Sequence, residues 1–265
     1  MIEHHVDLQG FDTGYESLNK CTKGWHKGDL IILASQTSVG KTTLTLNLAQ
    51  KVCERGGVVD FFTLEMSKIN LAKRILSNLT KIDGGKWKNP YRYFTEEDQT
   101  SAVQALEVYA KWNFEITDQP SLTISDIRAR VQKTRREHPK ENYLVLVDYL
   151  QLITLNRLYF SHAQAIYNFT KELKQIAERY QATIILISHL LSDFEERINK
   201  RPLLCDLYDG ESIEPNTDII MLLYPDAGEG NNRVKVDIVK QGTVPVRRVE
   251  FLFEKEVGGF VGGFE

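Results

Sequence analysis

The sequence predicts an α/β fold in which a twisted, mostly parallel β-sheet is flanked by helices and followed by a C-terminal β-hairpin. From residue 29 onward, short apolar runs of strand length alternate with segments of helical periodicity, which is typical of a parallel sheet with helices on both faces. Near the C-terminus the pattern changes to two adjacent strand-like runs. The expected strands of the main sheet are residues 30–34, 58–64, 114–117, 143–147, 183–187 and 219–223.

Helices are expected between these strands. Leu44, Leu48 and Val52 recur every four residues, as on one face of a helix, and the Gly56-Gly57 pair ends that helix. Ser125 is the expected N-cap of another helix. The apolar positions of this helix and of a third are Ile127 and Val131, and Phe169, Leu173, Ile176 and Ala177.

The two ends of the chain differ from this central part. Residues 234–239 and 246–253 are strand-like runs joined by residues 240–245, which predicts the hairpin. Residues 1–28 lack strong periodicity and are expected to be a lead-in or linker segment, and the glycine pairs within residues 258–265 predict a flexible tail. The main folded domain is therefore expected to be residues 29–257.

Composition excludes several classes of protein. Of the 265 residues, 42% are hydrophobic and 26% are charged, which is typical of a globular protein without membrane spans. The N-terminus has neither the basic start nor the apolar core of a signal peptide. Cys21, Cys53 and Cys205 are widely scattered, which predicts free thiols in a reducing, cytoplasmic compartment. The net charge of −3 does not indicate nucleic acid, but a ring can confine its basic groups to a central channel.

A phosphate-binding loop is the strongest motif. An apolar strand leads into a loop of small and polar residues that ends in Gly40-Lys41-Thr42, and an amphipathic helix follows. Backbone amides and the helix N-terminus of such a loop bind phosphate, the lysine reaches the β- and γ-phosphates, and the threonine hydroxyl ligates Mg²⁺. The expected cofactors are ATP and Mg²⁺. The first glycine of the usual eight-residue pattern is replaced here by Ser35. The expected nucleotide-binding residues are Ser35, Gln36, Thr37, Ser38, Val39, Gly40, Lys41, Thr42 and Thr43.

Three further polar residues follow strands whose carboxyl ends share the edge of the sheet with this loop. Asp148 ends a buried run and is expected to hold Mg²⁺ together with Thr42. Glu65 follows the second strand and is expected to orient and deprotonate the attacking water. Seen alone, a strand-terminal carboxylate is more often a turn residue or a helix cap, but the adjacent phosphate loop favours the catalytic role. His189 follows the fifth strand and is a candidate sensor of the γ-phosphate, although an ordinary exposed or hydrogen-bonded histidine fits the sequence equally well.

These segments together resemble the C-terminal motor domain of the DnaB family of replicative DNA helicases. The resemblance runs from about residue 11 to 255, and its most specific part is the Asp148-Tyr-Leu-Gln-Leu152 block. Other similar segments are Phe11–Leu18, Phe61–Met66, Ser121–Arg130, and Ser212–Glu214 with Asp218. The family commonly has a small residue at the first glycine position. The resemblance implies a RecA-like ATPase that forms a homo-hexamer or other ring, with nucleotide at each subunit boundary, in the cytoplasm of a bacterium or of the host of a phage or mobile element.

The resemblance also implies that single-stranded DNA passes through the ring, with a helicase loader or another replication protein as a partner. The DNA would be gripped by loops that follow the fourth and fifth strands and by the segment 207–214. The alternative for these loop residues is an ordinary solvated surface, and the basic stretch 128–136 is expected on the wet face of a helix. The DNA-contact candidates are Arg157, Arg197, Lys200, Arg201, Asp209 and Gly210.

Three features depart from the family pattern. Almost nothing precedes residue 11, where the family has an N-terminal domain and a linker helix. Tyr208 occupies the position of a DNA-gripping arginine. In the hairpin the family reads Lys-Gln-Arg-Asn, whereas this chain reads Lys240-Gln-Gly-Thr243, so the trans-acting lysine is retained and the arginine finger has become Gly242. An arginine finger is worth about 10³–10⁵ in rate, so hydrolysis should be slow unless Arg247 or Arg248 replaces it.

The sequence thus favours an ATP-dependent DNA helicase or translocase motor. The loss of the arginine finger leaves open a second function, a hydrolysis-poor nucleotide-binding module that assists ring assembly or regulates a true helicase. A third alternative, a recombination-type relative that forms filaments on DNA, is disfavoured by the Asp148–Leu152 block.

Overall fold

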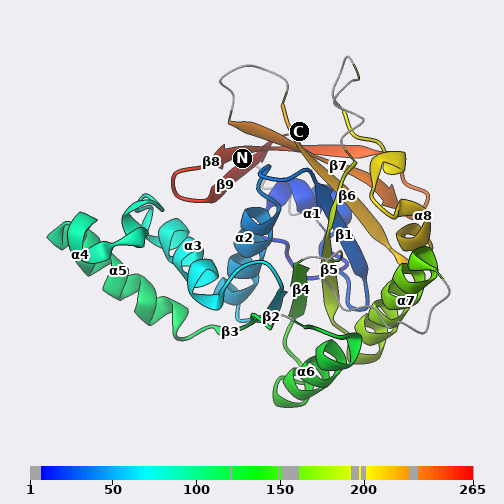
Figure 1. Ribbon diagram of the computed structural model, residues 1–265, viewed down its shortest axis with the longest axis horizontal. Helices are drawn as coiled ribbons and strands as arrows, with labels where there is room; N and C mark the ends of the chain where they lie inside the picture. The colour runs from blue at the N-terminus through cyan, green and yellow to red at the C-terminus, as the bar shows by residue number, and fades with distance from the viewer. Residues whose placement is uncertain are drawn as a thin grey trace.

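A single sheet of nine strands organises the described part of the chain (Figure 1). The computed structural model describes residues 7–119, 121–148, 150, 161–191, 197, 201–226 and 232–264. The strands are β1 (Leu30–Ser35), β2 (Val58–Thr63), β3 (Asn113–Thr117), β4 (Tyr143–Asp148), β5 (Thr183–His189), β6 (Ile219–Pro225), β7 (Arg233–Gln241), β8 (Arg247–Glu254) and β9 (Gly259–Phe264).

The spatial order of the strands is β3-β2-β4-β5-β1-β6-β7-β8-β9. Strands β3 to β6 in this order are parallel, and β7, β8 and β9 add to the sheet in antiparallel fashion. The six strands and the hairpin expected from the sequence are confirmed, with ends that differ by no more than two residues. Strands β1, β2 and β4 are buried at every position, and burial on both faces explains why they read as continuous apolar runs.

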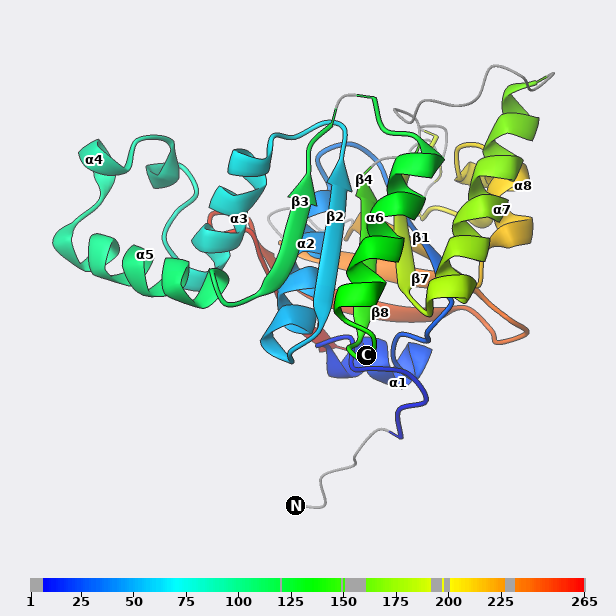
Figure 2. The same ribbon diagram turned by 90° about the horizontal axis from the view of Figure 1, so that it is seen from below.

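Helices cover both faces of the parallel strands (Figures 1 and 2). On one face, α1 (Glu16–Thr22), α2 (Lys41–Glu54) and α3 (Lys68–Thr80) bury residues such as Leu18, Leu48 and Leu71 in one cluster. On the other face, α6 (Ile124–Glu137) and α7 (His162–Tyr180) bury a second cluster that includes Ile127 and Leu173. No helix among the described residues has the length and apolar character that a bilayer-spanning segment needs.

The N-cap predicted for α6 is wrong. Thr123 caps this helix instead of Ser125: its hydroxyl accepts from the amide of Asp126, whose carboxylate accepts in return from the Thr123 amide. Two reciprocal bonds satisfy free amides at both positions, which Ser125 inside the first turn cannot do.

A small lobe projects beyond the β3 edge of the sheet and was not expected (Figures 1 and 2). Its elements after α3 are η1 (Lys86–Lys88), α4 (Pro90–Tyr93) and α5 (Glu96–Tyr109). Trp87 packs against Ala102 and Ala105 in a third apolar cluster. Three short elements lie among the described residues between β5 and β6: η4 (Leu204–Asp206), α8 (Gly210–Ile213) and η5 (Glu214–Asn216).

Both ends of the described chain belong to the folded domain, which corrects two predicted boundaries. In the supposed lead-in segment, Trp25 is fully buried and Phe11 pairs with it in a short bridge. The supposed flexible tail forms β9, where Phe260 stacks on Phe253 with ring centroids 4.5 Å apart. Strand pairing with β8 and this stacking fix a segment whose glycines suggested freedom, and Gly258 supplies the left-handed backbone (φ 62°) of the turn before it.

Candidate active site

The phosphate loop lies between β1 and α2 and is shaped by two residues with left-handed backbone. Ser38 has φ 65° and Gly40, at the N-cap of α2, has φ 111°. A Cβ at Gly40 would lie 3.1 Å from a ring carbon of Phe260 and 3.2 Å from one of Phe253. The loop therefore needs glycine at position 40 for its backbone conformation and for its close approach to β8 and β9. This conformation presents the N-terminus of α2 as an anion site.

Lys41 is held at the centre of the loop by backbone carbonyls. Its Nζ donates to the carbonyl oxygens of Ser35 (2.9 Å) and Gln36 (2.8 Å), and it lies 3.3 Å from Nδ1 of His189. The lysine is 8% exposed, and burial lowers its pKa to about 8 against the opposing effect of the Asp148 and Glu65 carboxylates. Phosphate oxygens are better partners than carbonyls for a desolvated ammonium, because they carry charge.

Thr42 and Asp148 form the second part of the site. The hydroxyl of Thr42 donates to Oδ2 of Asp148 over 2.8 Å, from the first turn of α2 to the end of β4. Asp148 is 1% exposed, and burial raises the pKa of its carboxyl to about 6, although the Thr42 bond and Lys41 act in the opposite direction. A hydroxyl and a carboxylate are the hard oxygen ligands that Mg²⁺ takes when substrate phosphates and waters complete its shell. The donor set therefore fits Mg²⁺.

Glu65 and His189 complete the edge of the sheet. Glu65 lies two residues beyond the end of β2 and is exposed to the cavity. His189 ends β5 opposite Ser35 in the parallel register. Burial and the neighbouring Lys41 lower the pKa of His189, while Glu65 raises it, so the imidazole is neutral at pH 7 and can accept or donate a hydrogen bond near a bound phosphate.

All of these groups meet at a cavity of about 720 Å³. Of the predicted nucleotide-binding residues, six line it, whereas Ser35, Gln36 and Val39 do not. The sequence prediction missed two parts of the cavity lining: a face of α3, and residues of the segments 84–88 and 255–258. The i, i+3, i+4, i+7 spacing of polar residues on α3 could have indicated this face. Its residues are Asn70, Lys73, Arg74 and Ser77.

Comparison with known proteins identifies the fold and the family. The sequence profile of the DnaB-like helicase C terminal domain matches residues 10–262. This chain belongs to that family. It is 34% identical over 262 residues to the replicative DNA helicase DnaC of Bacillus subtilis and 33% identical over 262 residues to the replicative DNA helicase DnaB of Geobacillus stearothermophilus. These alignments cover 96% of this chain and 57% of each relative, so the chain spans little more than half the length of the relatives it matches.

Solved structures of DnaB-like proteins have the same fold. The ATPase domain of G40P superimposes with a TM-score of 0.92 at 30% identity, covering 99% of this chain and 94% of that one. A DnaB-like replicative helicase, described with its interactions with primase, gives a TM-score of 0.91 at 30% identity and covers 98% of this chain and 63% of that one. The resemblance inferred from the sequence motifs is confirmed, as is the expected RecA-like α/β architecture.

Within the DnaB-like domain, those predicted DNA contacts that the structure describes do not line the cavity. Arg157 and Lys200 lie outside the described residues. Arg197 pairs with Asp206 through two bonds of 2.6 and 2.8 Å, and Arg201 pairs with Asp237 over 2.7 Å. Asp209 lies 3.0 Å from His162, and Gly210 begins α8. DNA contact remains a prediction for these residues, and for the two arginines it would compete with an existing ion pair.

The hairpin residues are also engaged within their own chain. Nζ of Lys240 donates to the carbonyl of Glu214. Arg247 donates to the carbonyls of Lys20 and Cys21 at the C-terminal end of α1, and Arg248 binds Asp237. Replacement of the arginine finger by Arg247 or Arg248 would therefore require breaking these contacts. Gly242 lies in the turn with φ 56°, and no atom lies within 4 Å of the place its Cβ would take.

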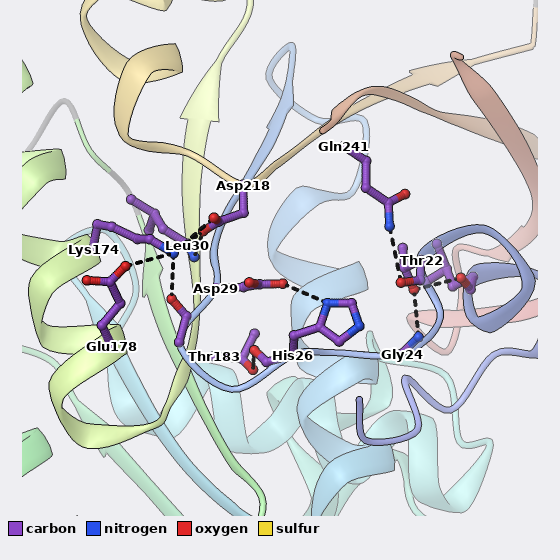
Figure 3. A network of polar contacts seen from close by, with 12 residues as sticks. Thr22, Gly24, His26, Asp29, Leu30, Lys174, Glu178, Thr183, Asp218 and Gln241 are labelled. Carbon is purple, nitrogen blue, oxygen red and sulfur yellow. Dashed lines mark hydrogen bonds and ion pairs between the residues drawn. The ribbon is translucent and has the colours of Figure 1, made fainter. Parts of the chain in front are cut away.

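Asp218, which belongs to a family-like segment, has a structural role at the opposite ends of the strands (Figure 3). Its carboxylate accepts from the amide of Leu30 (2.8 Å) and from Lys174 (2.7 Å), whose ammonium also donates to the carbonyl of Gly28. These bonds fix the start of β6 beside β1 and beneath α7. Figure 3 shows Lys174 directed at Asp218.

Proposed function

We propose that this chain is the motor domain of an ATP-dependent DNA helicase or translocase of the DnaB class. The observation that carries the proposal is the meeting of a buried Lys41, the Thr42–Asp148 pair and Glu65 at one cavity. Phosphoryl transfer to water requires cations, hard oxygen ligands and a carboxylate near the reacting phosphate. Such groups face one cavity here, at one edge of a parallel sheet.

In this mechanism the phosphate-loop amides and Lys41 bind the β- and γ-phosphates of ATP. Thr42 and Asp148 would hold Mg²⁺, which neutralises phosphate charge when it is bound. Glu65 orients the attacking water and accepts its proton. His189, beside Lys41, is placed to respond when a γ-phosphate draws the ammonium away from it.

We further propose that the chain acts as a hexameric ring on single-stranded DNA, with each nucleotide at a boundary between subunits. Lys240 then acts on the neighbouring subunit's nucleotide after it releases the Glu214 carbonyl, and Gly242 supplies no guanidinium at the arginine-finger position. Turnover is therefore slow compared with a motor that has this arginine. The relative described with its interactions with primase supports a replication protein of that kind as a partner.

The test is a steady-state assay of Mg²⁺-dependent ATP hydrolysis with and without oligo(dT), combined with a native-mass measurement. The unmodified chain should hydrolyse ATP faster with oligo(dT), and Lys41→Ala and Glu65→Ala should abolish this activity. Lys51→Ala is the matched control, because Lys51 lies on the same helix in a surface pair with Glu54. An ATPase rate that neither DNA nor the two substitutions change would refute the proposal.

The arginine-finger position separates a motor from a nucleotide-binding module. The open space at Gly242 accommodates a side chain, and its left-handed φ costs an arginine about 1–2 kcal/mol. Gly242→Arg should therefore raise the DNA-stimulated rate in the assembled ring. Tight ATP binding with negligible hydrolysis in both proteins would favour the hydrolysis-poor module instead.

A further inference from the structure

Asp237, a buried carboxylate on β7, has no part in the site described above. It is fully buried between β6 and β8. Arg248 donates to both of its oxygens (2.7 and 3.1 Å), Arg201 donates to Oδ2 (2.7 Å), and the hydroxyl of Tyr224 also donates to Oδ2 (3.1 Å). The two guanidinium groups hold the pKa of Asp237 below its usual value despite burial, so the carboxylate is ionised at neutral pH.

The two arginines come from parts of the chain with different expected roles. Arg201 belongs to the segment between β5 and η4, where Arg197 binds both the carbonyl of Arg201 (3.2 Å) and the carboxylate of Asp206. Arg248 is the second residue of β8, directly after the hairpin loop. One carboxylate therefore joins the segment after β5 to the hairpin through directional, charge-assisted bonds.

A second contact connects β7 to the neighbouring polar segments. Lys240, three residues after Asp237 on the same strand, donates to the carbonyl of Glu214 at the end of α8. Asp237 thus connects β7 to the segment after β5, and Lys240, nearer the turn of the hairpin, connects the same strand to the segment 207–214. Both segments are those expected to face DNA.

We propose that Asp237 is a positioning residue that couples the segment after β5 to the trans-acting hairpin. This inference rests on the proposed function, in which that segment contacts single-stranded DNA and Lys240 reaches the neighbour's nucleotide. A displacement of Arg201 on DNA binding changes the position of Asp237 and Arg248, and therefore of Lys240. Asp237 touches neither DNA nor nucleotide and acts only through these partners.

The test removes the two connections of Asp237 separately. Arg248→Gln removes the bonds between Asp237 and β8 of the hairpin, and Arg201→Gln removes the bond between Asp237 and the segment after β5. A double variant removes both. Arg233→Gln is the matched control. Arg233 lies on β7, as Asp237 does, and forms a loose ion pair with Glu250 on β8 (4.0 Å). For each full-length protein, thermal unfolding, oligo(dT) affinity, the KM for ATP, and kcat with and without oligo(dT) are measured.

Both single variants should keep the KM for ATP of the unmodified chain, and Arg248→Gln, which alters no DNA-contact candidate, should also keep its basal kcat and oligo(dT) affinity. In each single variant, the stimulation of kcat by oligo(dT) should decrease by a factor of between about 2 and 30. The double variant should lose no more stimulation than the more affected single variant, because either substitution interrupts the same connection. Arg201→Lys should recover part of the stimulation, since the ammonium keeps the charge without the planar geometry.

Other outcomes overturn the proposal in recognisable ways. Lower thermal stability with unchanged stimulation would make the cluster purely structural. A loss confined to Arg201→Gln, together with weaker oligo(dT) binding, would make Arg201 a direct DNA contact. Absence of DNA stimulation in the unmodified chain would refute the proposed function itself, whereas intact stimulation in all variants would leave that function standing and remove only the role of Asp237.

Discussion

Replacing Asp148 by asparagine should stabilise the nucleotide-free protein while it destroys the Mg²⁺ site. The pKa of the Asp148 carboxyl rises from 3.8 to about 6 because the group is buried. One pKa unit is worth about 1.4 kcal/mol, so the ionised carboxylate costs the folded state about 3 kcal/mol above pH 6. Asparagine keeps an acceptor for the Thr42 hydroxyl and carries no charge, so it avoids this cost.

The pH dependence follows from the direction of the change. A carboxyl with a raised pKa binds its proton more tightly in the folded protein, so the cost of ionisation is absent below pH 3.8 and complete above about pH 6. Asp148→Asn should therefore unfold at a temperature about 5 °C higher than the unmodified chain at pH 7.5, and this difference should disappear as the pH approaches 4.

Thermal unfolding in EDTA between pH 4 and 8 measures the effect, and addition of Mg²⁺ and ATP should then stabilise only the unmodified chain. Asp126→Asn is a control with the opposite sign. Hydrogen bonds from Thr123 lower the pKa of Asp126, so its carboxylate contributes stability at neutral pH that is lost as the pH falls. An Asp148→Asn protein that is less stable at pH 7.5, or equally affected at every pH, would refute the reasoning.

Three further substitutions have defined outcomes. Gly40→Ala should destabilise the domain by about 1–2 kcal/mol and weaken binding of a fluorescent ATP analogue, because φ is 111° and the new Cβ would lie 3.1 Å from a ring carbon. Lys174→Met should lower the free energy of unfolding in urea by about 1–3 kcal/mol, since Asp218 loses its ion pair, whereas Lys171→Met on the same helix should not. Tyr208→Arg should strengthen oligo(dT) binding, because Tyr208 is 40% exposed and the motif resemblance predicts a DNA-gripping arginine at its position. The dependence of binding on log salt, measured by fluorescence anisotropy, should steepen by about 0.7 for each additional phosphate that the protein neutralises.

The core of the site could be predicted from the sequence because it depends on strand ends. The carboxyl ends of parallel strands lie along one edge of a sheet, so residues that follow separate apolar runs must come together there. Asp148, Glu65 and His189 follow such runs within two residues, and Lys41 follows the first run across the phosphate loop. The structure places all four at the same cavity.

The parts that the sequence prediction missed depend on partners distant along the chain. The strand β9 has three glycines among its six residues and little local preference for a strand. Its conformation is set by pairing with β8 and by the contact of Phe260 with Asn47, 213 residues away. The carbonyls that bind Arg247 lie 226 and 227 residues from it. No local pattern encodes these contacts, so the sequence left open whether Arg247 could act in trans.

The two perturbed groups of the site together limit the pH range in which it can bind MgATP. Asp148 must be ionised to act as a ligand, which the pKa of about 6 allows only above that pH, and Lys41 must be protonated, which its pKa of about 8 allows only below that pH. Phosphate oxygens favour the charged ammonium, so binding near pH 8 should take up a proton at Lys41. A divalent cation favours the charged carboxylate, so binding near pH 6 should release a proton from Asp148. Calorimetric titration with a non-hydrolysable ATP analogue, repeated in two buffers of different ionisation enthalpy, measures both protons. Lys41→Met should remove the uptake and leave the release, and proton exchange that is equal at pH 6 and pH 8 would show that burial does not set these two pKa values.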